Sequence, residues 1–161
     1  MSQPSILKVE KIFGKLLMVM QATLISMKFL EMLMDYKMKY YAKVVSFSNE
    51  IEEEVLLSFG NKELYCFISE SPYSLVEGKL YLVELNLSFL DDEFLNMATE
   101  KKITIERVDN SFAYRITGVI SDGKLIADGF VFQDEIFAQE YAYLESNFVS
   151  LTSDRISVSF I

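Results

Sequence analysis

The side chains best suited to chemistry in this sequence are carboxylates that gather at two places. They are Glu50, Glu52, Glu53 and Glu54 in the first cluster and Asp91, Asp92 and Glu93 in the second. Neighbouring carboxylates can dock a basic partner or hold a divalent cation. Calcium loops need alternately spaced oxygen ligands and a glycine turn, and the first cluster has neither. We therefore expect no metal site and treat all seven residues as candidate contacts for a basic protein or peptide.

Both clusters also have a simple structural explanation. A charge run commonly forms a solvated loop, and acids ahead of Phe94 would stabilise the N-terminal end of a short helix over Asp91–Ala98. Glycoside hydrolysis needs two carboxylates at a fixed separation in a cleft. The sequence provides no such separation, so we predict no catalytic role for either cluster.

The other reactive groups also argue against an enzyme. Histidine is absent, which removes the commonest general base and metal ligand. The single cysteine, Cys66, lies in a predicted strand, where we expect a buried apolar residue and no activated thiolate. No serine lies in a G-x-S-x-G motif. The expectation is a non-enzymatic protein with no cofactor.

The charge balance excludes most nucleic-acid binders. The formal net charge is -9, whereas affinity for phosphate backbones comes largely from Lys and Arg. Aromatic side chains could line a stacking groove, but such grooves lie in positive potential. These aromatic residues are Tyr40, Tyr41, Tyr65, Phe67, Tyr73 and Tyr81. We expect them in a sheet core or on a protein-binding face.

Composition changes abruptly near Met38. Seven of the eight methionines lie in residues 1–38. Residues 1–37 carry five Lys and three acids, a net charge of +2, whereas residues 38–161 carry ten basic and 21 acidic residues, a net charge of -11. The sequence therefore predicts two parts, a Met-rich N-terminal segment over 1–37 and an acidic domain over 38–161.

The N-terminal segment is predicted to be helical. From Ile12 to Met34 it is rich in Leu and Met and has no proline. Its charge-free part, Leu16 to Met27, is shorter than the roughly 20 residues that a membrane-spanning helix requires. We expect a helix that packs on the barrel, or that contacts a membrane surface or a partner through residues 12–34.

Two further interpretations of this segment stay open. Lys8, Lys11 and Lys15 precede the apolar run as in a secretory signal, although no small-x-small cleavage site follows Ile25. Alternatively, Met38 is the biological start, because methionine content and charge both change there. A single cysteine excludes an intrachain disulfide and favours a reducing compartment. We expect a cytoplasmic protein, with membrane association and secretion as alternatives.

Short β-branched and aromatic runs separated by turn signals follow Met38. Strands are predicted at Lys39–Phe47, on either side of Gly60-Asn61, and at Lys79–Leu87. A meander of three strands is predicted from Lys102 onwards, with turns at Asp109-Asn110-Ser111 and Asp122-Gly123. The third strand of that meander is Lys124–Gln133.

The remaining predictions concern bends and the C-terminal strands. Gly118 and Gly129 lie inside predicted strands and indicate bulges or tight bends. Asp134–Ser146 is predicted to be a short helix or an irregular crossing. The last strand, Arg155–Ile161, is predicted to pair with its predecessor, Asn147–Leu151.

These elements predict a mainly β fold: a small, partly open barrel or sandwich with one or two short helices, preceded by an N-terminal helix. A five-stranded barrel of the oligonucleotide/oligosaccharide-binding type fits them by architecture. The function expected from acidity and from the lack of catalytic groups is protein binding, as by an inhibitor or immunity-type antagonist of a basic protein. Alternatives are a small-ligand or carbohydrate-binding barrel and a membrane-attached domain.

Overall fold

The computed structural model describes residues 6–34, 37–91 and 94–161. It divides the chain into two compact units, with the division between Tyr36 and Lys37. The first contains helix α1 (Ile6–Met34) and the second contains the β-strands. The predicted class, mainly β with a preceding helix, is confirmed.

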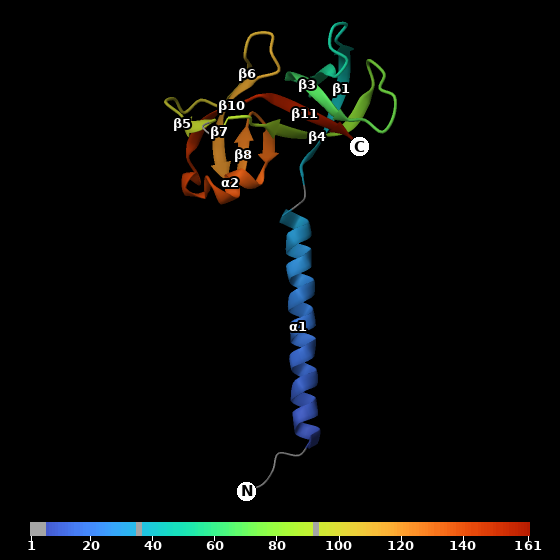
Figure 1. Cartoon of the computed structure of the whole chain (residues 1–161), viewed down its shortest axis with the longest axis vertical. Helices are drawn as coiled ribbons and strands as arrows, with labels where there is room; N and C mark the ends of the chain where they lie inside the picture. Colours follow the sequence, from blue (N-terminus) through green and yellow to red (C-terminus); the bar gives the residue numbers. More distant parts are fainter. Residues whose placement is uncertain (1–5, 35–36, 92–93) are drawn as a thin grey trace. The chain divides into compact units, whose positions relative to one another are not determined.

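Helix α1 is continuous over 29 residues (Figure 1). It contains no proline that would interrupt its backbone hydrogen bonds. The hydroxyl of Thr23 donates to the carbonyl oxygen of Val19, one turn back, at 2.9 Å. The helix predicted over residues 12–34 is confirmed, and it begins earlier, at Ile6.

Five strands of the second unit close into a ring. Their bounds are β1 (Lys39–Phe47), β2 (Glu54–Ser58), β3 (Glu63–Glu70), β4 (Leu80–Ser88) and β11 (Arg155–Phe160). Their order is β1-β2-β3-β11-β4, and β4 pairs with β1 to close the ring. Neighbours are antiparallel except β3 and β11, which are parallel. A small five-stranded ring of this kind has the architecture of the oligonucleotide/oligosaccharide-binding barrel.

A second sheet lies beside the barrel and contains six strands. Their bounds are β5 (Leu95–Met97), β6 (Thr104–Arg107), β7 (Tyr114–Ser121), β8 (Lys124–Ala127), β9 (Phe130–Gln133) and β10 (Phe148–Ser153). The order is β5-β10-β7-β8-β9. Strand β6 pairs with the first half of β7, and β8 pairs with the second half.

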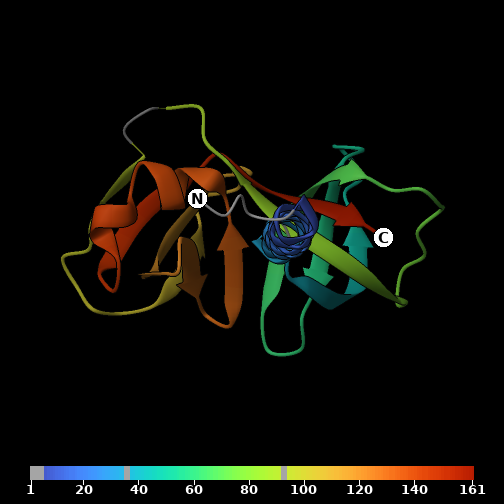
Figure 2. The same ribbon diagram turned by 90° about the horizontal axis from the view of Figure 1, so that it is seen from below.

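In sequence, the second sheet is an insertion between the barrel strands β4 and β11. Only Asp154 separates β10 from β11, so the chain runs from the sheet into the barrel almost as one strand (Figure 2). The buried hydroxyl of Ser153 accepts from the Ser88 N–H at 3.2 Å, and the Asp154 N–H donates to the Ser88 carbonyl oxygen at 2.8 Å. These bonds fix the junction to the end of β4.

One apolar cluster extends through the barrel and the second sheet. Inside the barrel, Val44, Leu57, Leu64, Val83 and Ile156 are fully buried. Alternate residues of β2, and of the second half of β4, are buried, so side chains fill the ring.

A short helix closes one side of the second sheet. Helix α2 (Glu135–Gln139) is followed by a 3-10 turn at Ala142–Leu144. The side chain of Asp134 caps α2 by accepting from the Ile136 N–H at 3.0 Å. Phe137 of α2 is fully buried. A short helix within Asp134–Ser146 is therefore confirmed.

Two hairpins agree with their turn signals. Gly60, with φ of 96°, joins β2 to β3, and Gly123, with φ of 69°, joins β7 to β8. The single strand predicted over Lys124–Gln133 is wrong, because β8 and β9 form another hairpin there. Asp128 and Gly129 turn the chain with φ of 49° and 81°. This is a tight turn at Gly129, and it follows the same Asp-Gly signal that marks Asp122-Gly123.

Two other local predictions are wrong. The helix expected over Asp91–Ala98 is absent from its described residues, because Leu95–Met97 form β5 and pair with β10. This pairing buries Leu95, and so tertiary contacts override the local helix preference. Strand β11 does not pair with β10 and instead lies between β3 and β4.

Gly118 has a different role from the predicted bulge. A Cβ at this position would lie 2.3 Å from the carbonyl oxygen of Ile126 and 3.0 Å from the Cβ of Ala127. The register of β7 with its neighbours is regular around Gly118. Glycine is therefore required because the backbone of β8 approaches so closely.

Candidate functional site

Two segments meet at one end of the barrel. They are the β1–β2 loop, residues 48–53, and residues 71–79, which join β3 to β4. The Gly78 N–H donates to the Val44 carbonyl oxygen at 2.7 Å, and the Phe47 N–H donates to the Glu77 carboxylate at 3.2 Å. These bonds tie the end of β1 to the segment that precedes β4.

Five exposed glutamates gather at this end, which we call the acidic end of the barrel. They are Glu50, Glu52 and Glu53 in the β1–β2 loop, Glu70 at the end of β3, and Glu77 in the following segment. Lys79 is the one basic residue in the stretches 48–53 and 69–79. A surface with one dominant sign of charge attracts partners of the opposite sign.

Glu54 forms an ion pair, unlike the exposed residues Glu50, Glu52 and Glu53 that precede it. Its carboxylate pairs with the Arg107 guanidinium at 3.1 Å, and the two side chains are only 15% and 18% exposed. The same guanidinium lies over the Tyr65 ring, 3.9 Å from its centroid. Glu54 therefore links β2 to the second sheet, and three of the four predicted contacts in this cluster remain on the surface.

Apolar side chains are also exposed at the acidic end. Ile51 is 39% exposed, Val76 46% and Leu80 66%. Tyr73 is 40% exposed and stacks on Tyr81 with ring centroids 5.7 Å apart. Apolar groups with charged groups around them are the usual composition of a protein interface.

The second predicted cluster does not join the first. Asp91 is exposed and follows β4, whereas the β1–β2 loop follows β1. Lys39 pairs with Glu84 and Lys43 with Leu80, so β1 and β4 end at opposite ends of the barrel. Asp92 and Glu93 lie outside the described residues. The structure thus separates Asp91 from the acidic end.

Sequence reasoning missed Glu70 and Glu77, because each is an isolated acid in the sequence. The hairpin predicted around Gly60-Asn61 could have indicated that Glu70 lies near the β1–β2 loop. Antiparallel pairing of β2 with β3 carries the end of β3 back towards the β1–β2 loop, and the segment after β3 must begin there.

The six aromatic residues considered for a groove are spread around the barrel. Tyr65 is covered by Arg107, and Phe67 is covered by Arg155, whose guanidinium carbon lies 4.0 Å from the ring centroid. Tyr40 packs against Phe130 inside the second unit. The chain's own side chains therefore contact Tyr40, Tyr65 and Phe67, whereas Tyr41 is 72% exposed and stands apart from the other exposed ring, Tyr73, in the sequence.

Burial favours the neutral forms of two titratable groups of the second unit, Cys66 and Tyr114. Cys66 is fully buried, and burial raises the pKa of its thiol far above the usual value. Burial likewise raises the pKa of Tyr114 to about 12, although its oxygen accepts a hydrogen bond from the Tyr65 N–H at 2.8 Å. Neither group is prepared for nucleophilic chemistry at neutral pH.

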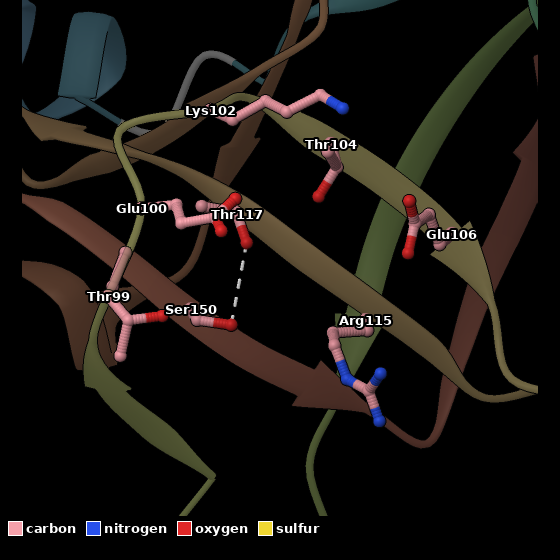
Figure 3. A pocket seen from close by; sticks show the side chains of 9 residues that line it. Thr99, Glu100, Lys102, Thr104, Glu106, Arg115, Thr117 and Ser150 are labelled. Atoms are coloured by element: carbon pink, nitrogen blue, oxygen red, sulfur yellow. Dashed lines mark hydrogen bonds between the residues drawn. The ribbon is translucent and has the colours of Figure 1, made fainter.

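A polar pocket of about 260 Å³ lies on the outer face of the second sheet (Figure 3). Its walls come from residues 98–102 and from strands β6, β7 and β10. The lining side chains are Ala98, Thr99, Glu100, Lys102, Thr104, Glu106, Arg115, Thr117 and Ser150. Thr117 donates to Ser150 at 3.4 Å. The pocket offers hydroxyls, two cations and two carboxylates, but no aromatic ring.

Neither the acidic end nor the polar pocket is arranged as a metal centre. Across residues 6–34, 37–91 and 94–161, no group of three His, Cys, Asp or Glu side chains could hold a metal ion. The arrangements support binding through charge, hydroxyl groups and apolar contact.

Comparison with known families bears on the second unit. The model of the family described as Uncharacterised conserved protein UCP019853 matches residues 38–161. The chain belongs to this family. The matched residues include the barrel, the second sheet, the acidic end and the polar pocket, whereas α1 lies outside them. No curated protein and no solved structure matches the chain.

The family description names no activity, ligand or partner. Nothing in the described geometry indicates catalysis. The geometry of the acidic end and of the polar pocket therefore carries the functional inference.

Proposed function

We propose that the family domain, residues 38–161, is a non-enzymatic protein-binding module that holds a basic protein at the acidic end of the barrel. An inhibitor or immunity-type antagonist of a basic protein would act in this way. The observation that carries the proposal is the gathering of five exposed glutamates, from the β1–β2 loop, the end of β3 and the segment that follows β3, around exposed apolar side chains.

The charge of the domain supports a basic partner. Residues 38–161 carry a formal net charge of -11, and three of the five glutamates lie in one loop. Opposite fields on two proteins speed their encounter and orient them before contact. A cationic protein would therefore approach this end of the barrel preferentially, and its association rate would fall as salt increases.

The exposed apolar residues would add binding free energy to the electrostatic attraction. Leu80, Val76 and Ile51 are exposed in the free domain, and burying them against a partner would stabilise the complex by removing apolar surface from water. The filled barrel interior also supports this proposal, because the ring has side chains where a ligand cavity would otherwise lie.

The test compares two triple variants of the full chain as bait in native lysate at low salt. The first, Glu50→Gln, Glu52→Gln and Glu53→Gln, removes the loop charges. The matched control removes three exposed carboxylates elsewhere, Glu63→Gln, Glu135→Gln and Glu140→Gln. A basic protein retained by wild type and by the control should bind the first variant about tenfold more weakly, or more so, because charge pairs at an interface are lost.

The affinity of the purified pair should also fall with increasing salt. Equal loss in both triple variants would show a general charge effect and would contradict a specific role for the acidic end. The proposal itself would be contradicted if every basic protein that the wild type retains bound the two triple variants with equal affinity.

A second candidate function rests on the polar pocket, which could bind a small polar molecule such as a sugar. Its hydroxyls and the guanidinium of Arg115 suit hydroxyl-rich ligands. Titration with monosaccharides and disaccharides should shift amide NMR signals of residues 98–106, 115–117 and 150. An Arg115→Gln variant should reduce those shifts. Unchanged spectra at millimolar sugar would remove this candidate.

A further inference from the structure

Helix α1 exposes apolar side chains to an extent unlike the rest of the chain. Thirteen large apolar residues between Val9 and Leu30 are each between 51% and 71% exposed. No side chain in the segment Val9–Leu30 is buried. Exposed apolar surface on this scale is found where a protein meets another apolar phase.

The apolar side chains surround the helix instead of forming a stripe. Leu16, Leu17, Met18, Val19 and Met20 are consecutive, and all are exposed. Since each residue advances about 100° around an α-helix, five in succession cover the whole circumference. A groove or a sheet would cover only one side of such a helix. Helices that are apolar all round are found in the core of a large protein or in a membrane.

The length of the segment matches a bilayer. Val9–Leu30 has 22 residues and is long and apolar enough to cross a membrane. At about 1.5 Å per residue it is about 33 Å long, close to the roughly 30 Å of the hydrocarbon layer. The charge-free run Leu16–Met27 is shorter than the roughly 20 residues that a spanning helix requires. The lysines that flank this run must therefore lie within the bilayer or at its surface.

Lys15 and Lys28 flank the charge-free run Leu16–Met27, whose centre, between Gln21 and Ala22, we place at the middle of the bilayer. Each lies about 10 Å from that centre, or about 5 Å inside the hydrocarbon boundary. A lysine side chain can extend along the helix and place its ammonium group in the interface, which lengthens the effective apolar span.

Polar groups near the middle of the segment are few and uncharged. The Thr23 hydroxyl is satisfied within the helix by the Val19 carbonyl oxygen, an arrangement that removes an unpaired donor from an apolar environment. The backbone of a helix is also hydrogen-bonded internally, as hydrocarbon surroundings require. We infer that α1 inserts across a lipid bilayer and attaches the family domain to it.

The test uses the absence of tryptophan from the chain, so that one introduced indole reports its own depth. Met20→Trp places the reporter at the centre of α1, and Phe13→Trp and Phe29→Trp place it towards each end. The full chain is reconstituted with phosphatidylcholine vesicles that carry bromine either near the headgroup or near the end of the acyl chain. We expect deep bromine to quench the Met20→Trp variant most strongly and shallow bromine to quench the other two variants.

A second measurement is flotation of the full chain with the same vesicles. Met18→Lys with Val19→Lys should lower the floated fraction at least tenfold, because a lysine side chain near the centre of a helix opposes its insertion into a bilayer. Asn49→Lys with Gln139→Lys adds the same charge at exposed positions of the family domain and should float like wild type.

Three outcomes would overturn the inference. Shallow quenching in all three tryptophan variants would show a helix that lies on the surface. Absence of quenching and flotation would show no insertion. A soluble oligomer of fixed stoichiometry that does not float would show that copies of α1 cover one another. The binding of a basic protein at the acidic end is independent of each outcome.

Discussion

Helix α1 and the barrel are both rich in large apolar side chains, but they place them in opposite ways. Leu17 of α1 is 51% exposed, whereas Leu57 of β2 is fully buried. In β2 of the barrel, buried residues alternate with partly exposed ones, because only one face of the strand turns inward. In α1 the apolar residues lie on every side. The number of apolar residues alone therefore does not decide whether they are buried. Their spacing decides whether they lie on one face of the element, where a single neighbouring surface can cover them.

The two regions also differ in how they satisfy their backbone groups. An α-helix bonds each N–H within the same segment, whereas a strand depends on a neighbour. Strand β3, for example, depends on β2 and on β11, which lies far along the chain. Helix α1 can therefore form without the barrel, and the barrel must assemble as a whole.

Removal of α1 should have the largest effect and should separate the two regions most sharply. A truncated chain of residues 37–161, which keeps the hydrogen bond from Lys37 to Asn86, should lose all flotation with vesicles, yet its free energy of unfolding should differ from that of the same unit in the full chain by less than about 0.5 kcal/mol. Urea denaturation followed by circular dichroism measures the second quantity. An insoluble or unfolded fragment would show that the barrel depends on α1 and would weigh against a biological start at Met38.

Two phenylalanines allow the same substitution in each region. Phe137 is fully buried, and Phe137→Ala should lower the free energy of unfolding of the second unit by about 3–5 kcal/mol, because it leaves a cavity. Phe13 is 66% exposed, and Phe13→Ala should leave that energy unchanged. A similar loss for both variants in urea denaturation would contradict the separation of the two units.

Substitution of one glycine in each region by alanine should change stability by a smaller amount and in opposite directions. Gly118→Ala should destabilise the second unit by about 1–3 kcal/mol, because its Cβ would overlap the Ile126 carbonyl oxygen. A Cβ added at Gly14 would meet nothing within 4 Å beyond the backbone of its own helix, and Gly14→Ala should stabilise α1 by about 1 kcal/mol. Thermal melts of the second unit and the helicity of α1 peptides measure these effects. A stabilising Gly118→Ala would show that β8 can move away from β7.

Tyr114 should make the stability of the second unit depend on alkaline pH. Burial raises its pKa from about 10 to about 12 in the folded protein, so the unfolded chain releases this proton first. The stabilisation is complete below pH 10 and is lost as pH rises towards 12, by up to about 1.4 kcal/mol per pH unit. Urea denaturation between pH 8 and 11.5, with phenolate absorbance, measures this loss.

The variant Tyr114→Phe should show a shallower decline above pH 10. It also loses the acceptor for the Tyr65 N–H, and so its stability at pH 8 should be lower than that of wild type. Identical slopes for the two proteins would show that Tyr114 does not titrate as expected.

Much of the local structure could be predicted from the sequence. The helix at residues 12–34, the strand Lys39–Phe47 and the hairpins at Gly60 and Gly123 all appear in the structure. Each depends on a local property, such as a run without proline, alternation, or a glycine with positive φ. The same kind of signal at Asp128-Gly129 predicted only a bulge or tight bend within one strand, because apolar residues continue on both sides of it, and the structure has a tight turn between two strands there.

The candidate site could be predicted only in part. Glu50, Glu52 and Glu53 were found because they are neighbours in sequence, whereas Glu70 and Glu77 reach the acidic end through the pairing of β2 with β3 and of β1 with β4. The ion pair of Glu54 with Arg107 joins residues 53 positions apart. No local pattern distinguishes Glu54 from its three neighbours.

The sequence by itself determined the division near Met38, the secondary-structure type on each side and the negative charge of the second part. Only the tertiary structure decided the closure of the barrel, the parallel pairing of β3 with β11, the insertion of a second sheet and the position of the acidic end. The physical reason is that every residue except proline carries the same backbone donor and acceptor. Which distant strands pair therefore depends on how all the buried faces fit together, and no single segment specifies it.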